Sequence, residues 1–251
     1  MRCRTWMLAI VGGAVAIIGQ ASAQDLIFLG NQGAMPGVRA LAEEYSRTSG
    51  YKVTVIEDPI QLQKSLTAGP ADLVSVSPEA MAELDRKGLV YTDTITPFTL
   101  APLGVSVRAG APKPDIGTVE AFRTALLNAK SIGYSRGCSG QNISDAIDKL
   151  GLTETLKGRI QLTGGGTGPV TFYLARGDFE LGIQQSNIMV GAPGTDFLGP
   201  VPGALNKPCP NSVAVLKVSK QPYFARQMIN FMVSPAAAPI LRQVHEEPAK
   251  P

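Results

Sequence analysis

Short apolar segments alternate with amphipathic segments over the first third of the chain, and this alternation restricts the possible folds most strongly. Residues 26–29 form a continuous apolar run, typical of a buried strand in a parallel sheet, and residues 52–56 and 72–76 are the next expected strands. Ser77-Pro78 then marks the start of a helix, because Ser caps a helix well and Pro fits its first turn. Strands and helices joined by short connections indicate an α/β fold with a mainly parallel sheet. A second block of this kind begins near residue 103.

The segments outside these two blocks have a different character. Residues 92–102 are rich in Pro and Thr, and we expect them to connect the blocks. Residues 221–244 have helical periodicity, and we expect them to return and pack on the first block. Residues 246–251 are expected to form a loose tail.

A strand, a polar loop and a helix follow one another at residues 131–142, Ser-Ile-Gly-Tyr-Ser-Arg-Gly-Cys-Ser-Gly-Gln-Asn. The helix has apolar residues at helical spacing and is expected to end at Gly151, with Ser139 as its N-cap. The first N–H groups of a helix lack partners within it, and the helix dipole favours negative charge there. The unit is therefore either an ordinary strand–helix turn or an anion-binding site.

Polar loops follow several of the expected strands at their carboxyl ends, where α/β folds bind ligands. These loops share many small hydrogen-bonding groups and few charges, a combination typical of a site that binds without reacting. The candidate ligand-binding residues are Asn31, Gln32, Gly33, Gln61, Ser77, Ser135, Arg136, Ser139, Gly140, Gln141 and Gln185.

Catalytic and metal chemistry find less support in the residues. Ser135, Ser139 or Cys138 would need a neighbouring base to act as a nucleophile, and the only histidine, His245, lies near the tail. Two distant cysteines and one histidine also lack the spacing of a metal site. The glycine-rich residues 163–168 lack the Gly-Lys-Ser/Thr of a phosphate-binding loop. We therefore expect no enzyme, no cofactor and no metal, with a Ser- or Cys-dependent secreted enzyme as the less favoured alternative.

The first residues predict export. Basic residues, an apolar run at 6–18 and the small residues Ala21-Ser22-Ala23 indicate a signal peptide over residues 1–23, cleaved after Ala23, and hence a periplasmic or secreted protein. In an oxidising compartment Cys138 and Cys209 can form a disulfide; two buried free thiols are the alternative. The 23 Lys and Arg residues nearly balance the 20 Asp and Glu residues, and no basic run contains aromatics, so we expect no nucleic-acid partner.

A set of stretches after the signal peptide spans nearly the whole chain. They are Gly33-Ala-Met, Ala71-Asp-Leu-Val, residues 104–115, Thr118-Val-Glu-Ala-Phe, residues 130–135, residues 175–185 and residues 231–239. Together they resemble the molybdate-binding-protein-like family of extracellular (periplasmic) solute-binding proteins of ABC transporters. The resemblance implies a two-lobed periplasmic binding protein of type II, with a hinge and a ligand cleft between the lobes. Lobe I would comprise residues 24–102 and 216–251, and lobe II residues 103–215.

The resemblance also implies a monomer that passes a small anionic or polar solute to the membrane permease of an ABC importer. In the molybdate binders of this family, loop serines, backbone N–H groups and a late tyrosine hold the oxyanion. Here Asn31 and Gln32 occupy the first loop, Glu57-Asp58-Pro59 the second, and residues 184–187 include no tyrosine. The ligand is therefore either an oxyanion such as molybdate or tungstate, or a small organic anion. A periplasmic sensor that binds a ligand for a signalling partner is a further alternative.

Overall fold

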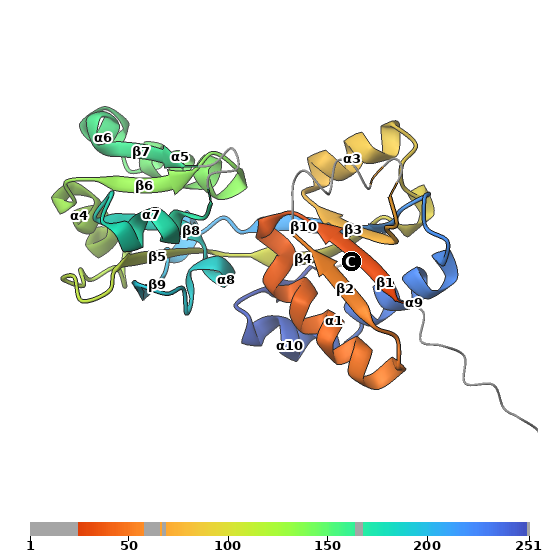
Figure 1. The fold of residues 1–251 in the computed structure, drawn as a ribbon. Helices are drawn as coiled ribbons and strands as arrows, with labels where there is room; N and C mark the ends of the chain where they lie inside the picture. The colour runs from red at the N-terminus through yellow and green to blue at the C-terminus, as the bar shows by residue number, and fades with distance from the viewer. Residues whose placement is uncertain (1–24, 58–65, 67–68, 164–167, 250–251) are drawn as a thin grey trace, which may run out of the picture.

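The computed structural model describes residues 25–57, 66, 69–163 and 168–249, so the expected signal peptide and Gln61 lie outside it. The chain forms two lobes, each built on its own β-sheet with helices packed around it, and the chain crosses between them twice (Figure 1). This arrangement confirms the expected two-lobed α/β fold. Within the described ranges, no helix has the length and apolar character needed to cross a bilayer.

Lobe I contains a six-stranded sheet in the order β11-β4-β10-β3-β1-β2. Its strands are β1 (Leu26–Gly30), β2 (Val53–Ile56), β3 (Leu73–Val76), β4 (Thr96–Ala101), β10 (Cys209–Val215) and β11 (Glu247–Pro248). Strand β1 pairs in parallel with both β2 and β3, whereas β10 is antiparallel to β3 and β4. The helices of this lobe are α1 (Met35–Ser49), α3 (Pro78–Arg86), α9 (Pro222–Met232) and α10 (Ala237–Gln243).

Lobe II contains a five-stranded sheet in the order β7-β6-β8-β5-β9. Its strands are β5 (Leu103–Arg108), β6 (Ile132–Ser135), β7 (Ile160–Thr163), β8 (Leu181–Gln185) and β9 (Thr195–Pro200). Its helices are α4 (Val119–Asn128), α5 (Cys138–Lys149), α6 (Thr153–Leu156), α7 (Val170–Arg176) and α8 (Ser186–Met189). Strands β7, β6 and β8 are parallel, and β5 is antiparallel to its neighbours β8 and β9.

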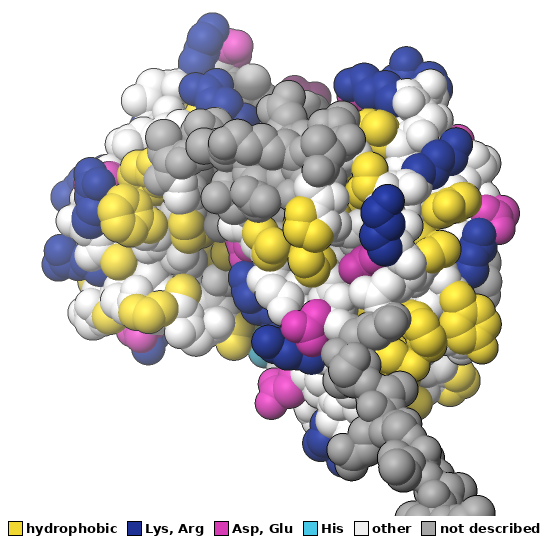
Figure 2. Space-filling model, turned by 45° about the vertical axis from the view of Figure 1, so that its right-hand side comes forward, with side chains coloured by type: hydrophobic (Ala, Val, Ile, Leu, Met, Phe, Trp, Pro, Cys, Tyr) yellow, Lys and Arg dark blue, Asp and Glu magenta, His cyan; other side chains and the backbone are white. Residues whose placement is uncertain are grey.

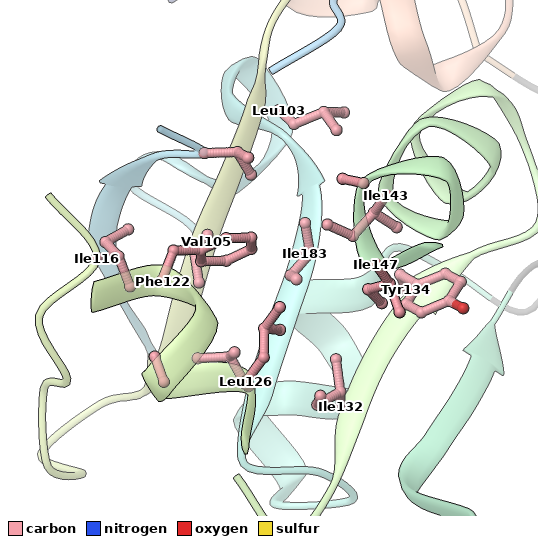
Figure 3. Packing of buried hydrophobic residues seen from close by; sticks show 14 of the residues in the cluster. Leu103, Val105, Ile116, Phe122, Leu126, Ile132, Tyr134, Ile143, Ile147 and Ile183 are labelled. Carbon is pink, nitrogen blue, oxygen red and sulfur yellow. The ribbon is translucent and has the colours of Figure 1, made fainter. Parts of the chain in front are cut away.

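Each lobe has its own hydrophobic core. In lobe II, helices α4 and α5 bury their apolar faces against the sheet, and Figure 3 shows Phe122 of α4 and Ile143 of α5 near the strand residue Ile183. In lobe I, α1 buries Val38 and Leu41 in a separate cluster that includes the side chains of α9 and α10. The two lobes therefore have separate hydrophobic cores.

Local signals place the helix ends that frame the cleft. Ser77 caps α3 as predicted, because its hydroxyl accepts a hydrogen bond from the N–H of Ala80 at 3.3 Å. Gly151, just after α5, has φ +68°, the left-handed conformation expected of a glycine that ends a helix. Ser139, in contrast, is not the cap of α5: the helix begins at Cys138, and its N-cap is Gly137, which has no side chain to cap it.

Three expectations about the chain path are corrected by long-range pairing. Residues 96–101 form the strand β4 and are not merely a connecting segment. Strand β10 joins the lobe I sheet, so the return to this lobe comes by Cys209 and earlier than the expected residue 216. The tail is held as well, because Glu246 is buried and β11 pairs with β4.

Candidate functional site

A cleft of about 900 Å³ lies between the two lobes. Its walls are the segments that follow the carboxyl ends of strands in both sheets, including Asn31 after β1, Ser77 after β3 and Arg136 after β6. Parallel strands of both lobes thus direct their following loops into one space, as the α/β pattern of the sequence predicts.

The structure places most of the predicted ligand-binding residues on this cleft. Those that line it are Asn31, Gly33, Ser77, Ser135, Arg136, Ser139, Gln141 and Gln185. Gly140 is not among the lining residues, and Gln61 lies outside the described ranges. Gln32 belongs to the short helical turn Gln32–Ala34 at the edge of the same loop.

The start of α5 forms the lobe II wall of the cleft. The hydroxyl oxygens of Ser135 and Ser139 are 2.9 Å apart and share a hydrogen bond. The first N–H groups of α5 have no partner within the helix, and the N-cap residue Gly137 has no side chain with which to cap them. Arg136 lies exposed beside them, and its backbone N–H donates to the carbonyl of Thr163 at 3.0 Å. Hydroxyls, N–H groups and a guanidinium therefore face the cleft together.

Gly140 shapes this wall from behind. A Cβ at this position would lie 1.6 Å from the carbonyl oxygen of Ser135. No side chain fits there, so the glycine lets the first turn of α5 pack directly on the end of β6. Gly140 therefore positions the wall without lining the cleft.

A disulfide joins Cys138 to Cys209 and confirms the predicted pairing, with 5.9 Å between the two Cα atoms. Cys138 is the first residue of α5, and Cys209 is the first residue of β10. Both line the cleft. Asn142, one turn further along α5, donates to the carbonyl of Lys207 at 2.8 Å. The start of α5 is thus fastened to the second crossing by a covalent bond and a hydrogen bond.

Charges of opposite sign line the two sides of the cleft. Arg136 and Lys207 lie on the lobe II side, and Glu57 and Glu79 on the lobe I side. Glu57 forms an ion pair with Arg39 at 3.1 Å, which offsets its charge. Hydrogen bonds from its own backbone N–H and from Ser77 hold the pKa of the Glu79 carboxyl below its usual value. Elsewhere on the face seen in Figure 2, basic and acidic side chains are interspersed with apolar ones.

Three carboxamides meet near Gly33, at the base of the cleft. A Cβ placed on Gly33 would lie 2.8 Å from Nε2 of Gln185, 3.6 Å from Oδ1 of Asn31 and 3.9 Å from Oδ1 of Asn211. The sequence analysis found Asn31 and Gln185 but missed Asn211. The available signal was weak: Asn211 and Ser212 are two polar residues just before the apolar run 213–216.

A buried carboxyl supports the same loop from behind. Glu246 is 1% exposed, and its Oε1 accepts hydrogen bonds from the backbone N–H of Gly37 at 2.8 Å and from Nδ2 of Asn187 at 2.7 Å. Nδ2 of Asn187 also donates to the carbonyl of Gly33 at 3.0 Å. Burial raises the pKa of the Glu246 carboxyl to about 7, although the hydrogen bond from Asn187 lowers it in part. The tail, α8 and the first loop are thus linked at one point.

The cleft lacks the parts of a nucleophilic enzyme among the residues that the structure describes. Cys138 is bonded to Cys209 and so has no free thiol. His245 is exposed and packs near Phe197, and it does not line the cleft beside Ser135 and Ser139. No group of three or more His, Cys, Asp or Glu side chains in the described ranges is arranged to hold a metal ion.

Residues 27–244 match the family model described as bacterial extracellular solute-binding protein. This match covers both lobes and the entire cleft. The chain belongs to this family. By the description of this family, the chain is a bacterial extracellular solute-binding protein.

A curated relative, the aconitate isomerase of a Pseudomonas species, is 27% identical over 238 residues, which cover 92% of this chain and 90% of the relative. The match runs through both lobes and includes the cleft walls. This relative is an enzyme, so it corrects our expectation that the chain is not one. The expectation considered only Ser and Cys nucleophiles and metals, and it left out isomerisation by proton transfer, for which a carboxylate can serve as the base.

Solved structures confirm the fold. The periplasmic molybdate-binding protein of Azotobacter vinelandii superposes with a TM-score of 0.72 at 19% identity, covering 90% of this chain and 99% of that one. The sulfate-binding protein SubI of Mycobacterium tuberculosis gives a TM-score of 0.69 at 20% identity, with coverage of 91% and 88%. PEB3 with bound L-phospholactate gives 0.71 at 16% identity, with coverage of 89% and 99%.

Proposed function

We propose that this protein binds a small organic polycarboxylate in the cleft between its lobes, with aconitate as the first candidate. The observation that carries the proposal is the lobe II wall, where the uncapped start of α5, Ser135, Ser139 and Arg136 face the cleft together. Such a wall attracts anions, because unpaired N–H groups and the helix dipole favour negative charge.

The size and the neutral groups of the cleft favour an organic anion over a bare oxyanion. Its volume of about 900 Å³ lies within the range of pockets for small organic molecules. Carboxamides at the base of the cleft can donate hydrogen bonds to a carboxylate of the ligand that the start of α5 does not contact. The Pseudomonas relative is named for a tricarboxylate, and L-phospholactate in PEB3 is also an organic anion.

In the same proposal, the protein is exported and acts in the periplasm as a monomer. Loss of residues 1–23 would leave the disulfide and both lobes intact. A closed cleft would hold the anion between Arg136 on one lobe and the loop of Gly33 on the other, and a permease would accept the closed form.

A second candidate function is isomerisation of the bound tricarboxylate, which the Pseudomonas relative favours. In aconitate, the methylene group lies beside both a carbon–carbon double bond and a carboxylate. A base that removes one methylene proton leaves an allylic anion, which can rotate and take the proton back to give the other geometric isomer. Among the described residues that line the cleft, Glu57 and Glu79 are the only carboxylates that could act as this base.

Calorimetry on the mature protein tests the first proposal. The panel is trans-aconitate, cis-aconitate, the saturated analogue tricarballylate, citrate, molybdate, tungstate and sulfate. We expect heat from the tricarboxylates and none from the tetrahedral oxyanions. Binding of molybdate and tungstate alone would refute a polycarboxylate ligand.

Proton NMR in D₂O tests the second function. Conversion of cis- to trans-aconitate, with deuterium entering the product, is expected if a carboxylate of the cleft exchanges the methylene proton with solvent. Glu57→Gln and Glu79→Gln would identify the base by loss of turnover with retained binding. Tight binding of both isomers without any conversion would rule out the isomerase function and leave the binding function intact.

A further inference from the structure

We propose that Asn211, on the strand that returns to lobe I, donates a hydrogen bond from its Nδ2 to a carboxylate of the bound anion; this inference rests on the proposed function. Nothing in the sequence singled this residue out. Four observations carry the inference: its burial, its unpaired donor, its place on the sheet and its neighbours.

Asn211 is 5% exposed, and its Nδ2 makes no hydrogen bond with any residue in the described part of the chain. A buried amide donor without a partner is unfavourable, so such groups are rare in folded proteins. Asn211 nevertheless lines the cleft. The atom that Asn211 directs toward Gly33 is its Oδ1. A half-turn of the carboxamide exchanges Oδ1 with Nδ2 and presents the donor to a ligand in the cleft.

The sheet explains why the side chain is directed to the cleft. Asn211 pairs with Thr99 of β4, whereas β3 ends at Val76, opposite Ser212. The register between β10 and β4 shifts between Asn211 and Ser212, as it does at a β-bulge. Bulges redirect side chains and occur often beside functional sites. Asn211 therefore lies one residue beyond the end of β3, where the cleft begins.

The neighbours of Asn211 favour a carboxylate. Asn31 and Gln185 approach the same point beside Gly33, so the base of the cleft carries neutral amides in place of charges. An amide N–H can donate to a carboxylate oxygen without adding charge to the site. The cations Arg136 and Lys207 lie on the lobe II wall, where they are placed to meet another carboxylate of the same ligand.

The position of Asn211 also gives the contact a role in specificity. It lies two residues after Cys209, which the disulfide fastens to the start of α5. A single ligand that contacts both α5 and Asn211 must span from the lobe II wall to the returning strand. A ligand with two or more carboxylates can place one at the start of α5 and another at Asn211, so a hydrogen bond from Asn211 favours such ligands over anions that bind at α5 alone.

Calorimetry with trans-aconitate tests the assignment in three variants of the mature protein. Asn211→Ala removes the donor, and we expect about a tenfold loss of affinity. Asn211→Asp places a negative charge against the carboxylate, and we expect about a hundredfold loss at pH 7. Asn128→Asp is the matched control, because Asn128 is exposed at the end of α4 and does not line the cleft; its affinity should equal that of the wild type.

The outcomes separate this inference from the proposed function. Affinities of Asn211→Ala and Asn211→Asp within twofold of the wild type would overturn the role of Asn211 while leaving the polycarboxylate proposal intact. If the wild type binds only sulfate or molybdate, the polycarboxylate proposal and the selection by Asn211 both fail. Melting temperatures of the unliganded variants check folding, and a loss of affinity in Asn211→Ala at an unchanged melting temperature would support the contact.

Discussion

Replacing the buried residue Glu246 by Gln should remove a pH dependence of the free energy of unfolding. Burial raises the pKa of this carboxyl from its usual 4.5 to about 7. The folded state therefore binds more protons than the unfolded state between these two values. By linkage, the protonated Glu246 carboxyl contributes its full stabilisation of the folded state below pH 4.5, and this contribution is lost as pH rises to about 7.

The size of the effect follows from the same values. A rise from 4.5 to about 7, at about 1.4 kcal/mol for each pH unit, corresponds to about 3 kcal/mol. In Glu246→Gln, the amide oxygen can still accept from the N–H of Gly37 and from Asn187, as Oε1 does now. Because Gln carries no charge at any pH, its stability relative to the wild type should be higher at pH 8 than at pH 5 by about 2–3 kcal/mol.

Urea unfolding followed by circular dichroism at pH 5 and pH 8 measures the difference. The matched control is Glu247→Gln, next in the chain, whose carboxylate is about half exposed in an ion pair with Arg242 at 3.0 Å. This control should change the free energy of unfolding by less than about 1 kcal/mol at both pH values. A Glu246→Gln effect that is equal at pH 5 and pH 8 would refute the reasoning, because the buried charge would then cost nothing.

Three further predictions concern the lobe II wall. Replacing Cys138 and Cys209 together by Ser should lower the free energy of unfolding by about 4 kcal/mol, the chain-entropy value for residues 71 apart, as measured by urea unfolding. Gly140→Ala should lower the free energy of unfolding by at least about 1–3 kcal/mol and weaken trans-aconitate binding. Gly158→Ala, where no atom lies within 4 Å of the new Cβ, should change neither quantity. Equal behaviour of the two variants in thermal unfolding and calorimetry would contradict this role of Gly140. Arg136→Ala combined with Ser139→Ala should weaken trans-aconitate binding about tenfold to a hundredfold with little change in the unliganded melting temperature, and unchanged affinity in calorimetry would exclude this wall as the anion site.

The sequence predicts the parts of this fold that depend on neighbours in the chain. The strand, loop and helix at residues 131–151 follow from apolar spacing, a glycine stop and small polar residues, and the structure has all three. The sequence also predicts that the loops after β1 and β3 line the binding site, because parallel strands have their carboxyl ends at one edge of the sheet.

Residues whose roles depend on distant partners escaped prediction. Glu246 resembles part of a charged tail until its contacts with Gly37 and Asn187, far away in the chain, are known. The strand at residues 96–101 contains a proline and two threonines, and it forms because β10 and β11 pair with it from the end of the chain. Asn211 lines the cleft only because of the same long-range pairing.

The placement of β10 has a consequence for the order in which the protein is built. Lobe II is one continuous segment whose ends meet, since the N–H of Val201 donates to the carbonyl of Leu103 at 3.0 Å. Its sheet is complete once Pro200 has been made, whereas the lobe I sheet lacks an interior strand until Val215 follows. Contacts over short chain separations form faster than distant ones. Lobe II should therefore fold first, and lobe I should complete its sheet against the folded lobe II.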